Sequence, residues 1–195
     1  MLGYYVGGQH RSVALVGARI PFNPILGETL QLQGPSGEMF YGEQISHHPP
    51  ITAFQLEGPG KCYTFSGSYE SKMSLSGIDS VKGTRVGNIV FSFPDGGRIS
   101  VQDPQMQMVN LLSSKKVLKV SGQMIITDHV NNLVAEFIYT PEVKEGYFSK
   151  KKEAFDFSER SDYFRLKIYE EKPDGSRELR AEGDGSFLSY IQIDG

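Results

Sequence analysis

Two adjacent histidines are the residues of this sequence that are best suited to bind a ligand or take part in a reaction. His47 and His48 follow the polar run 43–46 and precede Pro49 and Pro50. Proline disfavours the helical region for the residue before it, so the backbone at His48 is expected to be extended. Adjacent side chains on a regular strand point to opposite faces, so the two rings would share a ligand only where the chain bends at the strand end.

Four roles are open to this pair from the residues alone. One is structural, with one ring buried and one exposed. A zinc site needs three or four converging ligands, and no spacing links the other two histidines, His10 and His129, to the pair. Catalysis needs a nucleophile and an orienting carboxylate; Ser46 is adjacent, but no nucleophile elbow surrounds it. Phosphate recognition needs charge-assisted donors, and an imidazole that titrates near ~6.5 can be held charged by an anion.

A second polar and proline-rich run, Pro21–Glu28, lies just upstream. Pro21 and Pro24 fix two φ angles, and Pro24 disfavours the helical region at Asn23. Asn23 is therefore expected to be extended, with its amide projecting. On spacing alone, a rigid loop between strands is favoured over a functional role for this run. Its apolar residues are expected to anchor the turn in the core: Phe22, Ile25 and Leu26.

The elements that position these residues are expected to be short strands. Turn signals such as Gly34–Gly37, Pro94–Gly97 and Pro173–Gly175 separate them, and no window holds a helical period over three turns. Residues 104–112 come nearest to a helix, but Met106 and Met108 alternate as in a strand. About a dozen strands at ~8–12-residue spacing predict an all-β antiparallel sandwich or barrel. The expected strands are 12–16, 28–33, 39–46, 51–57, 63–69, 84–93, 98–102, 116–121, 123–127, 133–139, 162–170, 177–183 and 187–193.

Composition narrows the class of protein. A chain of 195 residues without repeat or linker predicts a single domain, 1–195. A net charge of −3 argues against a general nucleic-acid binder. The single cysteine, Cys62, cannot form an internal disulfide and fits a reducing, cytosolic setting. No run approaches the ~20 apolar residues of a membrane span, and the first residues do not resemble a signal peptide.

The run Glu43–Pro50, Glu-Gln-Ile-Ser-His-His-Pro-Pro, resembles the signature of the oxysterol-binding protein-related family of lipid-transfer proteins. Pro21–Glu28 resembles the second landmark of that family. Gly146–Ser149, followed by Lys150–Lys152, resembles a third and weaker one. The resemblance runs from about Leu15 to the end of the chain.

The resemblance implies an incomplete or near-complete antiparallel β-barrel with a lipid-sized cavity. It implies non-enzymatic, intracellular lipid binding and transfer between membranes, of a sterol or a phospholipid such as phosphatidylserine, with exchange for phosphatidylinositol 4-phosphate. The headgroup-binding residues would be His47, His48 and Asn23. No cofactor or metal is implied. A cytoplasmic monomer that touches anionic membranes transiently is expected, with Lys150, Lys151 and Lys152 as candidate membrane contacts; a solvated turn is the alternative for this lysine run.

The sequence also departs from the family pattern. Family members usually carry a phosphate-contacting lysine immediately before the first landmark, and Ile20 stands there. Arg19 is a weaker candidate, because on a regular strand it would point to the other face. The N-terminal lid and the C-terminal basic region of the family are expected to be missing. The alternative function is therefore a β-barrel interaction module without lipid-transfer activity, and a histidine-assisted hydrolase is a third hypothesis.

Overall fold

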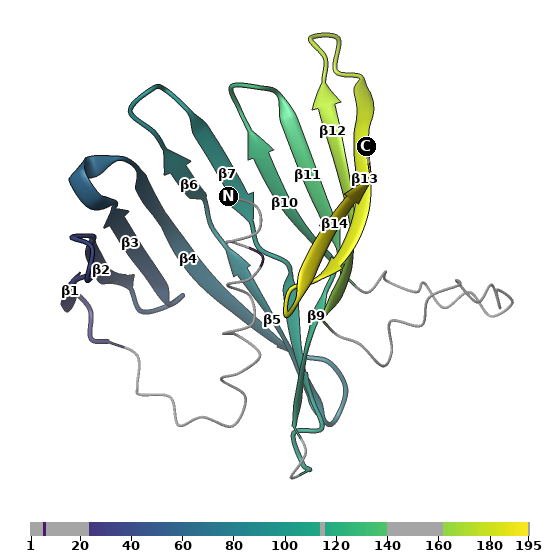
Figure 1. Ribbon diagram of the computed structural model, residues 1–195. Coiled ribbons are helices and arrows are strands. Elements are labelled where there is room, and N and C mark those ends of the chain that lie inside the picture. Colours follow the sequence, from purple (N-terminus) through teal and green to yellow (C-terminus); the bar gives the residue numbers. More distant parts are fainter. Residues whose placement is uncertain (1–5, 7–23, 114–115, 140–161, 195) are drawn as a thin grey trace, which may run out of the picture.

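The strands form one twisted antiparallel sheet that curves but does not close (Figure 1). The computed structural model describes residue 6 and residues 24–113, 116–139 and 162–194. The main path of the sheet is β1-β2-β3-β4-β6-β7-β10-β11-β12-β13-β14, and a side branch runs from β4 through β5 and β8 to β9. The predicted class, an all-β antiparallel and incompletely closed sheet, is confirmed. The strands are β1 (Thr29–Gln33), β2 (Met39–Ser46), β3 (Ile51–Glu57), β4 (Thr64–Leu75), β5 (Ser80–Val86), β6 (Ile89–Ser92), β7 (Arg98–Gln102), β8 (Gln105–Val109), β9 (Val117–Ser121), β10 (Gln123–Asp128), β11 (Leu133–Ile138), β12 (Tyr163–Glu171), β13 (Arg177–Ser186) and β14 (Tyr190–Asp194), and a short 3-10 turn, η1 (Pro59–Lys61), precedes β4.

One face of the sheet carries the apolar core. Residues directly opposite each other in paired strands point to the same side, so the register identifies this inner face. One register row crosses nine strands and consists of small and apolar residues throughout. Its members, from β2 to β13, are Gly42, Phe54, Gly67, Ile89, Val101, Ile126, Ala135, Ile168 and Ala181.

Aromatic rings extend this inner face on both sides of the row. Phe65 stacks on Phe91 with ring centroids 4.1 Å apart. Phe137 and Phe164 are buried and meet edge to face at 5.2 Å. Val6 is 1% exposed and belongs to the same core. Burial of this apolar surface is the main driving force for the curvature that wraps the sheet around it.

The tight turns follow the glycine and proline signals. Gly37, Gly96 and Gly175 each adopt a positive φ in a predicted turn, a conformation that other residues reach only with strain. Residues 105–109 form a strand, as their alternation indicated. The expected strand over 12–16 lies outside the described residues.

The expected single strand over 84–93 is wrong. The chain forms two strands there, β5 and β6, which pair with different halves of β4. The break is at Gly87, where a Cβ atom would lie 1.7 Å from the carbonyl oxygen of Ser68. The backbones approach too closely for any side chain, so the strand ends and a new pairing begins.

The first hairpin of the side branch is the part of the fold that the sequence pattern did not indicate. β4 continues past its expected end at Tyr69 to Leu75, and β5 returns beside it. β8 and β9 complete a four-stranded arm that points to the bottom of Figure 1, away from the hairpin loops at the top. The reason it was missed is the serine- and lysine-rich composition of 70–82, which lacks the usual strand signal.

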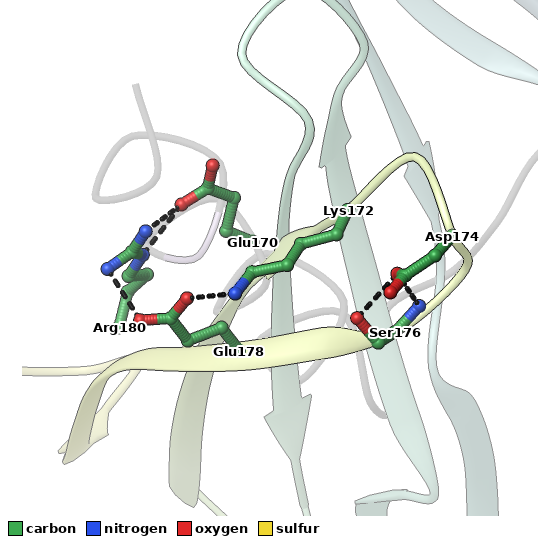
Figure 2. A network of polar contacts seen from close by, with 6 residues as sticks. All are labelled: Glu170, Lys172, Asp174, Ser176, Glu178 and Arg180. Atoms are coloured by element: carbon green, nitrogen blue, oxygen red, sulfur yellow. Dashed lines mark hydrogen bonds and ion pairs between the residues drawn. The ribbon is translucent and has the colours of Figure 1, made fainter.

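Charged side chains stabilise the β12–β13 hairpin (Figure 2). The guanidinium of Arg180 binds Glu170 and also donates to Glu178 at 2.8 Å. The carboxylate of Glu178 lies 2.7 Å from the ammonium of Lys172. The hydrogen bond with Lys172, together with the charges of Arg180 and Lys172, lowers the pKa of Glu178 below its ordinary value. This network is exposed, so its effect on stability is modest and depends on salt.

Candidate functional site

The structure brings the two sequence motifs together at one corner of the sheet. The amide of Gly27 donates a 3.1 Å hydrogen bond to the carbonyl oxygen of Gln44. Directly beyond this bond, β1 and β2 pair in antiparallel register, with Thr29 opposite Glu43. The described end of the first motif and the strand part of the second are therefore neighbours.

The first motif ends in a compact turn that leads into β1. The backbone amide of Ile25 donates to the carboxylate of Glu28 at 3.0 Å, and the amide of Glu28 donates to the carbonyl of Ile25 at the same distance. Gly27 has φ 80°, which suits glycine. Ile25 and Leu26 are 74% and 63% exposed, so the expectation that they anchor the turn in the core is wrong. They precede the edge strand β1, where no described element covers them.

A β-bulge shapes the second motif. Gln44 lies opposite Thr52 and Ser46 lies opposite Ile51, which leaves Ile45 as the extra residue on β2. Gln44 is 2% exposed, and its side chain accepts from the Thr52 hydroxyl and donates to the Ser46 carbonyl, both at 2.7 Å. The buried amide therefore fixes the bulge and the direction in which the chain leaves the strand.

The histidine pair lies just beyond this bulge, in the turn that joins β2 to β3. Both rings are exposed, their centroids are 4.6 Å apart, and their planes make an angle of 64°. The bend that would bring adjacent residues together is thus present. The turn is held on its far side, where the amide of Ser71 donates to the carbonyl of Pro50 at 3.4 Å.

The structure does not describe the other predicted site residues. Asn23, Arg19, Phe22 and Lys150–Lys152 lie outside the described residues. His129 lies in the β10–β11 hairpin at the opposite end of the strands, 2.8 Å from the Ser100 hydroxyl. Across the described ranges, no three histidine, cysteine or acidic residues gather as a metal site.

A hollow of about 290 Å³ opens on the three strands that carry the motifs. Its volume is just below the ~300–1,000 Å³ typical of small-molecule pockets. Gly42 contributes to it by having no side chain between Leu30 and Phe54 in the register. Apart from Glu43, which opens the second motif, sequence reasoning did not single out the lining residues, because an alternating strand pattern gives no sign of which positions border a hollow. They are Thr29, Leu30, Gln31, Tyr41, Gly42, Glu43, Ala53, Phe54 and Gln55.

The arrangement joins two different chemical environments. Two exposed imidazole rings, which can donate hydrogen bonds to an anion, stand at the end of strands whose inner face is apolar. The arrangement suits an amphipathic molecule with an anionic end. In the described part of the chain, no helix is long and apolar enough to cross a membrane.

Known proteins resemble this chain in sequence. The family model for oxysterol-binding protein matches residues 3–163. Oxysterol-binding protein 9 of Dictyostelium discoideum is 33% identical over 153 residues, which cover 76% of this chain and 35% of that protein. Oxysterol-binding protein-related protein 2 of Mus musculus is 48% identical over 58 residues, which cover 29% of this chain and 12% of that protein. The chain therefore spans about a third of the Dictyostelium relative, and the match with the mouse protein is shorter still.

Solved structures share the fold. The Osh1 ORD domain in complex with cholesterol superposes with a TM-score of 0.72 at 22% identity, over 96% of this chain and 40% of that one. The Osh3 ORD from Saccharomyces cerevisiae in complex with PI(4)P gives a TM-score of 0.68 at 21% identity, over 90% of this chain and 43% of that one. With the family model matching most of its length and both motifs meeting at one corner of the sheet, the chain belongs to the oxysterol-binding protein family.

Proposed function

We propose that this protein binds one lipid molecule, with the anionic headgroup at the histidine corner and the apolar part against the inner face of the sheet. The observation that carries the proposal is the exposed histidine pair, held beyond the bulge that Gln44 fixes and beside the turn that ends at Gly27. Relatives crystallised with cholesterol and with PI(4)P support both parts of such a ligand.

The headgroup part rests on His47 and His48. Their rings are close enough to contact one phosphate, and imidazolium N–H groups form charge-assisted hydrogen bonds with phosphate oxygens. Asn23 is proposed as a further ligand, and Arg19 as the residue that supplies the positive charge that Ile20 does not.

The apolar part rests on the inner face. Phe54 packs against both Phe65 and Tyr69, and its ring centroid lies 5.1 Å from that of Phe65 and 5.3 Å from that of Tyr69. Leu30 and Leu32 on β1 are half exposed on the same side of the sheet. A sterol ring system or an acyl chain would cover these side chains and remove their surface from water.

Beyond binding, we propose non-enzymatic transfer of the lipid between membranes, with exchange of a sterol or phosphatidylserine for phosphatidylinositol 4-phosphate. The unit that does this is residues 1–195, acting as a cytosolic monomer without cofactor. Contact with anionic membranes is transient, and Lys150–Lys152 are candidate contacts.

The test is native mass spectrometry of the protein after incubation with liposomes that contain sterol, phosphatidylserine and phosphatidylinositol 4-phosphate. A one-to-one phosphoinositide complex is expected. The double variant His47→Ala/His48→Ala should lose this complex and keep its fold, because both side chains are exposed. His129→Ala, which removes an exposed histidine at the opposite end, is the matched control and should bind as the wild type does.

A lipid complex that survives in the double variant would refute the role of the histidines.

The second candidate function is an interaction module without lipid transfer. The modest size of the hollow on β1–β3, about 290 Å³, favours this alternative. Absence of every lipid from the wild-type protein in the same spectra would support it.

A further inference from the structure

The arm of β4, β5, β8 and β9 carries an apolar end that the headgroup corner does not use. Two loops meet there: residues 76–79 between β4 and β5, and residues 110–113 after β8. The amides of Leu111 and Leu112 donate to the backbone and side-chain oxygens of Asp79, at 3.2 and 2.6 Å. Asp79 therefore holds the two loops together as one surface.

This surface exposes large apolar side chains to an unusual degree. Ile78 is 95% exposed and Leu112 is 81% exposed, one in each loop. Directly behind them, Leu75 at the end of β4 is 83% exposed. We call these three residues the apolar tip. Clustered exposed apolar residues at a protruding end are typical of an interaction site.

Basic residues lie just behind the apolar tip. Lys82 and Lys119 stand in one register row, on either side of Gln107, and Lys116 immediately precedes β9. Along the arm, this row lies two residues, or roughly 7 Å, behind the last paired row, in which β5 begins, β8 ends and β9 begins. Within 71–84, 105–113 and 116–121, four lysines stand against the single carboxylate of Asp79, although the whole chain has a net charge of −3.

Within the described residues, no acidic side chain forms an ion pair with Lys82, Lys116 or Lys119; Lys72 lies 3.5 Å from Glu70. The positive charge at this end is therefore free to act on a partner. Apolar side chains that project ahead of lysines match the layers of an anionic bilayer, because interfacial apolar side chains are buried some 5–10 Å into the boundary between headgroups and acyl chains.

We infer that the apolar tip inserts into the interface of an anionic membrane, with Lys82, Lys116 and Lys119 at the level of the lipid phosphates. The arm leaves the sheet on the same side as the histidine turn, because Pro50 contacts Ser71, where the extension of β4 begins. Docking through the tip would bring the headgroup corner towards the bilayer. The inference deepens the proposed lipid binding and assigns its membrane contact to a surface other than Lys150–Lys152.

The chain has no tryptophan, which permits a direct test. Ile78→Trp places a single fluorophore in the apolar tip, and Val130→Trp, in the exposed β10–β11 hairpin loop at the opposite end, is the matched control. Each variant is mixed with phosphatidylcholine vesicles with and without about 30 mol% phosphatidylserine, enough to give an anionic surface. The emission of Ile78→Trp should shift to shorter wavelength and be quenched by brominated lipid with the anionic vesicles only, and that of Val130→Trp should not change.

Charge is tested by Lys82→Gln/Lys119→Gln, with Lys61→Gln in the distant η1 turn as control. Each lysine near an anionic surface contributes about 1 kcal/mol to binding, which is about fivefold in partitioning, so the double variant should bind these vesicles about 25-fold more weakly. The control should bind as the wild type does.

An Ile78→Trp emission that does not respond to anionic vesicles would overturn the inference. So would a shift that depends on protein concentration without vesicles, which would mean that the tip pairs with a second copy or another protein surface. These outcomes are separate from the lipid complex seen by mass spectrometry. A lipid complex without tip insertion would support the proposed lipid binding and contradict the membrane docking. Tip insertion without a lipid complex would support the docking and contradict the lipid binding.

Discussion

The amide of Gly27 and the carbonyl of Gln44 are joined by a 3.1 Å hydrogen bond that connects the two motifs of the family. The bond lies one step beyond the last pair of β1 and β2 and closes the corner of the sheet. Gln44 meets both motifs: its backbone binds Gly27 and its side chain holds the bulge before the histidines. The geometry of the histidine corner therefore depends on this one residue.

Replacing Gln44 should weaken both the fold and the site. Gln44→Leu keeps the volume but leaves the Ser46 carbonyl and the Thr52 hydroxyl without this partner. Loss of partners for such groups costs about 1–3 kcal/mol, and urea unfolding should show a decrease in stability of that size. Phosphoinositide binding should also fall, because the histidine turn loses its fixed direction. Gln55→Leu, on the exposed side of neighbouring β3, should stay within about 0.5 kcal/mol of the wild type; an equal loss in both variants would contradict the role given to Gln44.

Headgroup binding should weaken as pH rises. An imidazolium donates from both ring nitrogens and carries a charge, whereas neutral imidazole donates from one. Phosphoinositide binding measured by isothermal titration calorimetry should therefore decrease as pH rises and the imidazoles lose their charge. Binding of an uncharged sterol serves as the control and should not follow this profile. A flat profile for the phosphoinositide would argue against the histidines as its ligands.

Gly87 should tolerate no side chain. A Cβ at this position would lie 1.7 Å from the Ser68 carbonyl oxygen, so Gly87→Ala must separate the backbones where β5 gives way to β6. A loss of stability of about 3 kcal/mol or more is expected, in the upper tail for single substitutions. Gly83→Ala, four residues earlier on β5, is the matched control, because the nearest neighbour of its Cβ would be the Met106 carbonyl oxygen at 3.9 Å. Chemical denaturation of both variants measures the difference, and comparable midpoints would show that the close approach is not rigid.

Acid should weaken the β12–β13 network through Glu178. The hydrogen bond from Lys172 and the nearby charges lower the pKa of Glu178 from its ordinary value of 4.5. A lowered pKa in the folded state gives a stabilisation that is present above the unfolded value and is lost as pH falls through the folded value. Urea midpoints measured from about pH 6 to 3 should therefore fall less for Glu178→Gln than for the wild type. Glu182 is also on β13, and its carboxylate lies 3.5 Å from the ammonium of Lys167 on β12. Glu182→Gln should change the pH dependence of the urea midpoint less than Glu178→Gln does, and the reverse result would contradict the role given to Glu178.

The sequence was sufficient where the signal is local. The turns at Gly37, Gly96 and Gly175 follow from residues that alone adopt a positive φ easily. The sequence was not sufficient where two distant backbones meet, because the strand break at Gly87 depends on the position of Ser68. The burial of Ile25 and Leu26 was also wrongly expected, because apolar character does not reveal which element will cover a turn.

For the candidate site, the sequence by itself determined the two motifs, the histidine pair and the family to which they point. Only the tertiary structure decided that Gly27 and Gln44 meet, that the bulge at Ile45 turns both rings outward, and that an apolar tip stands on an arm of its own. The physical reason is register. Which residues lie side by side is set by hydrogen bonding between strands that are far apart in the chain, and a local pattern of side chains carries no information on that pairing.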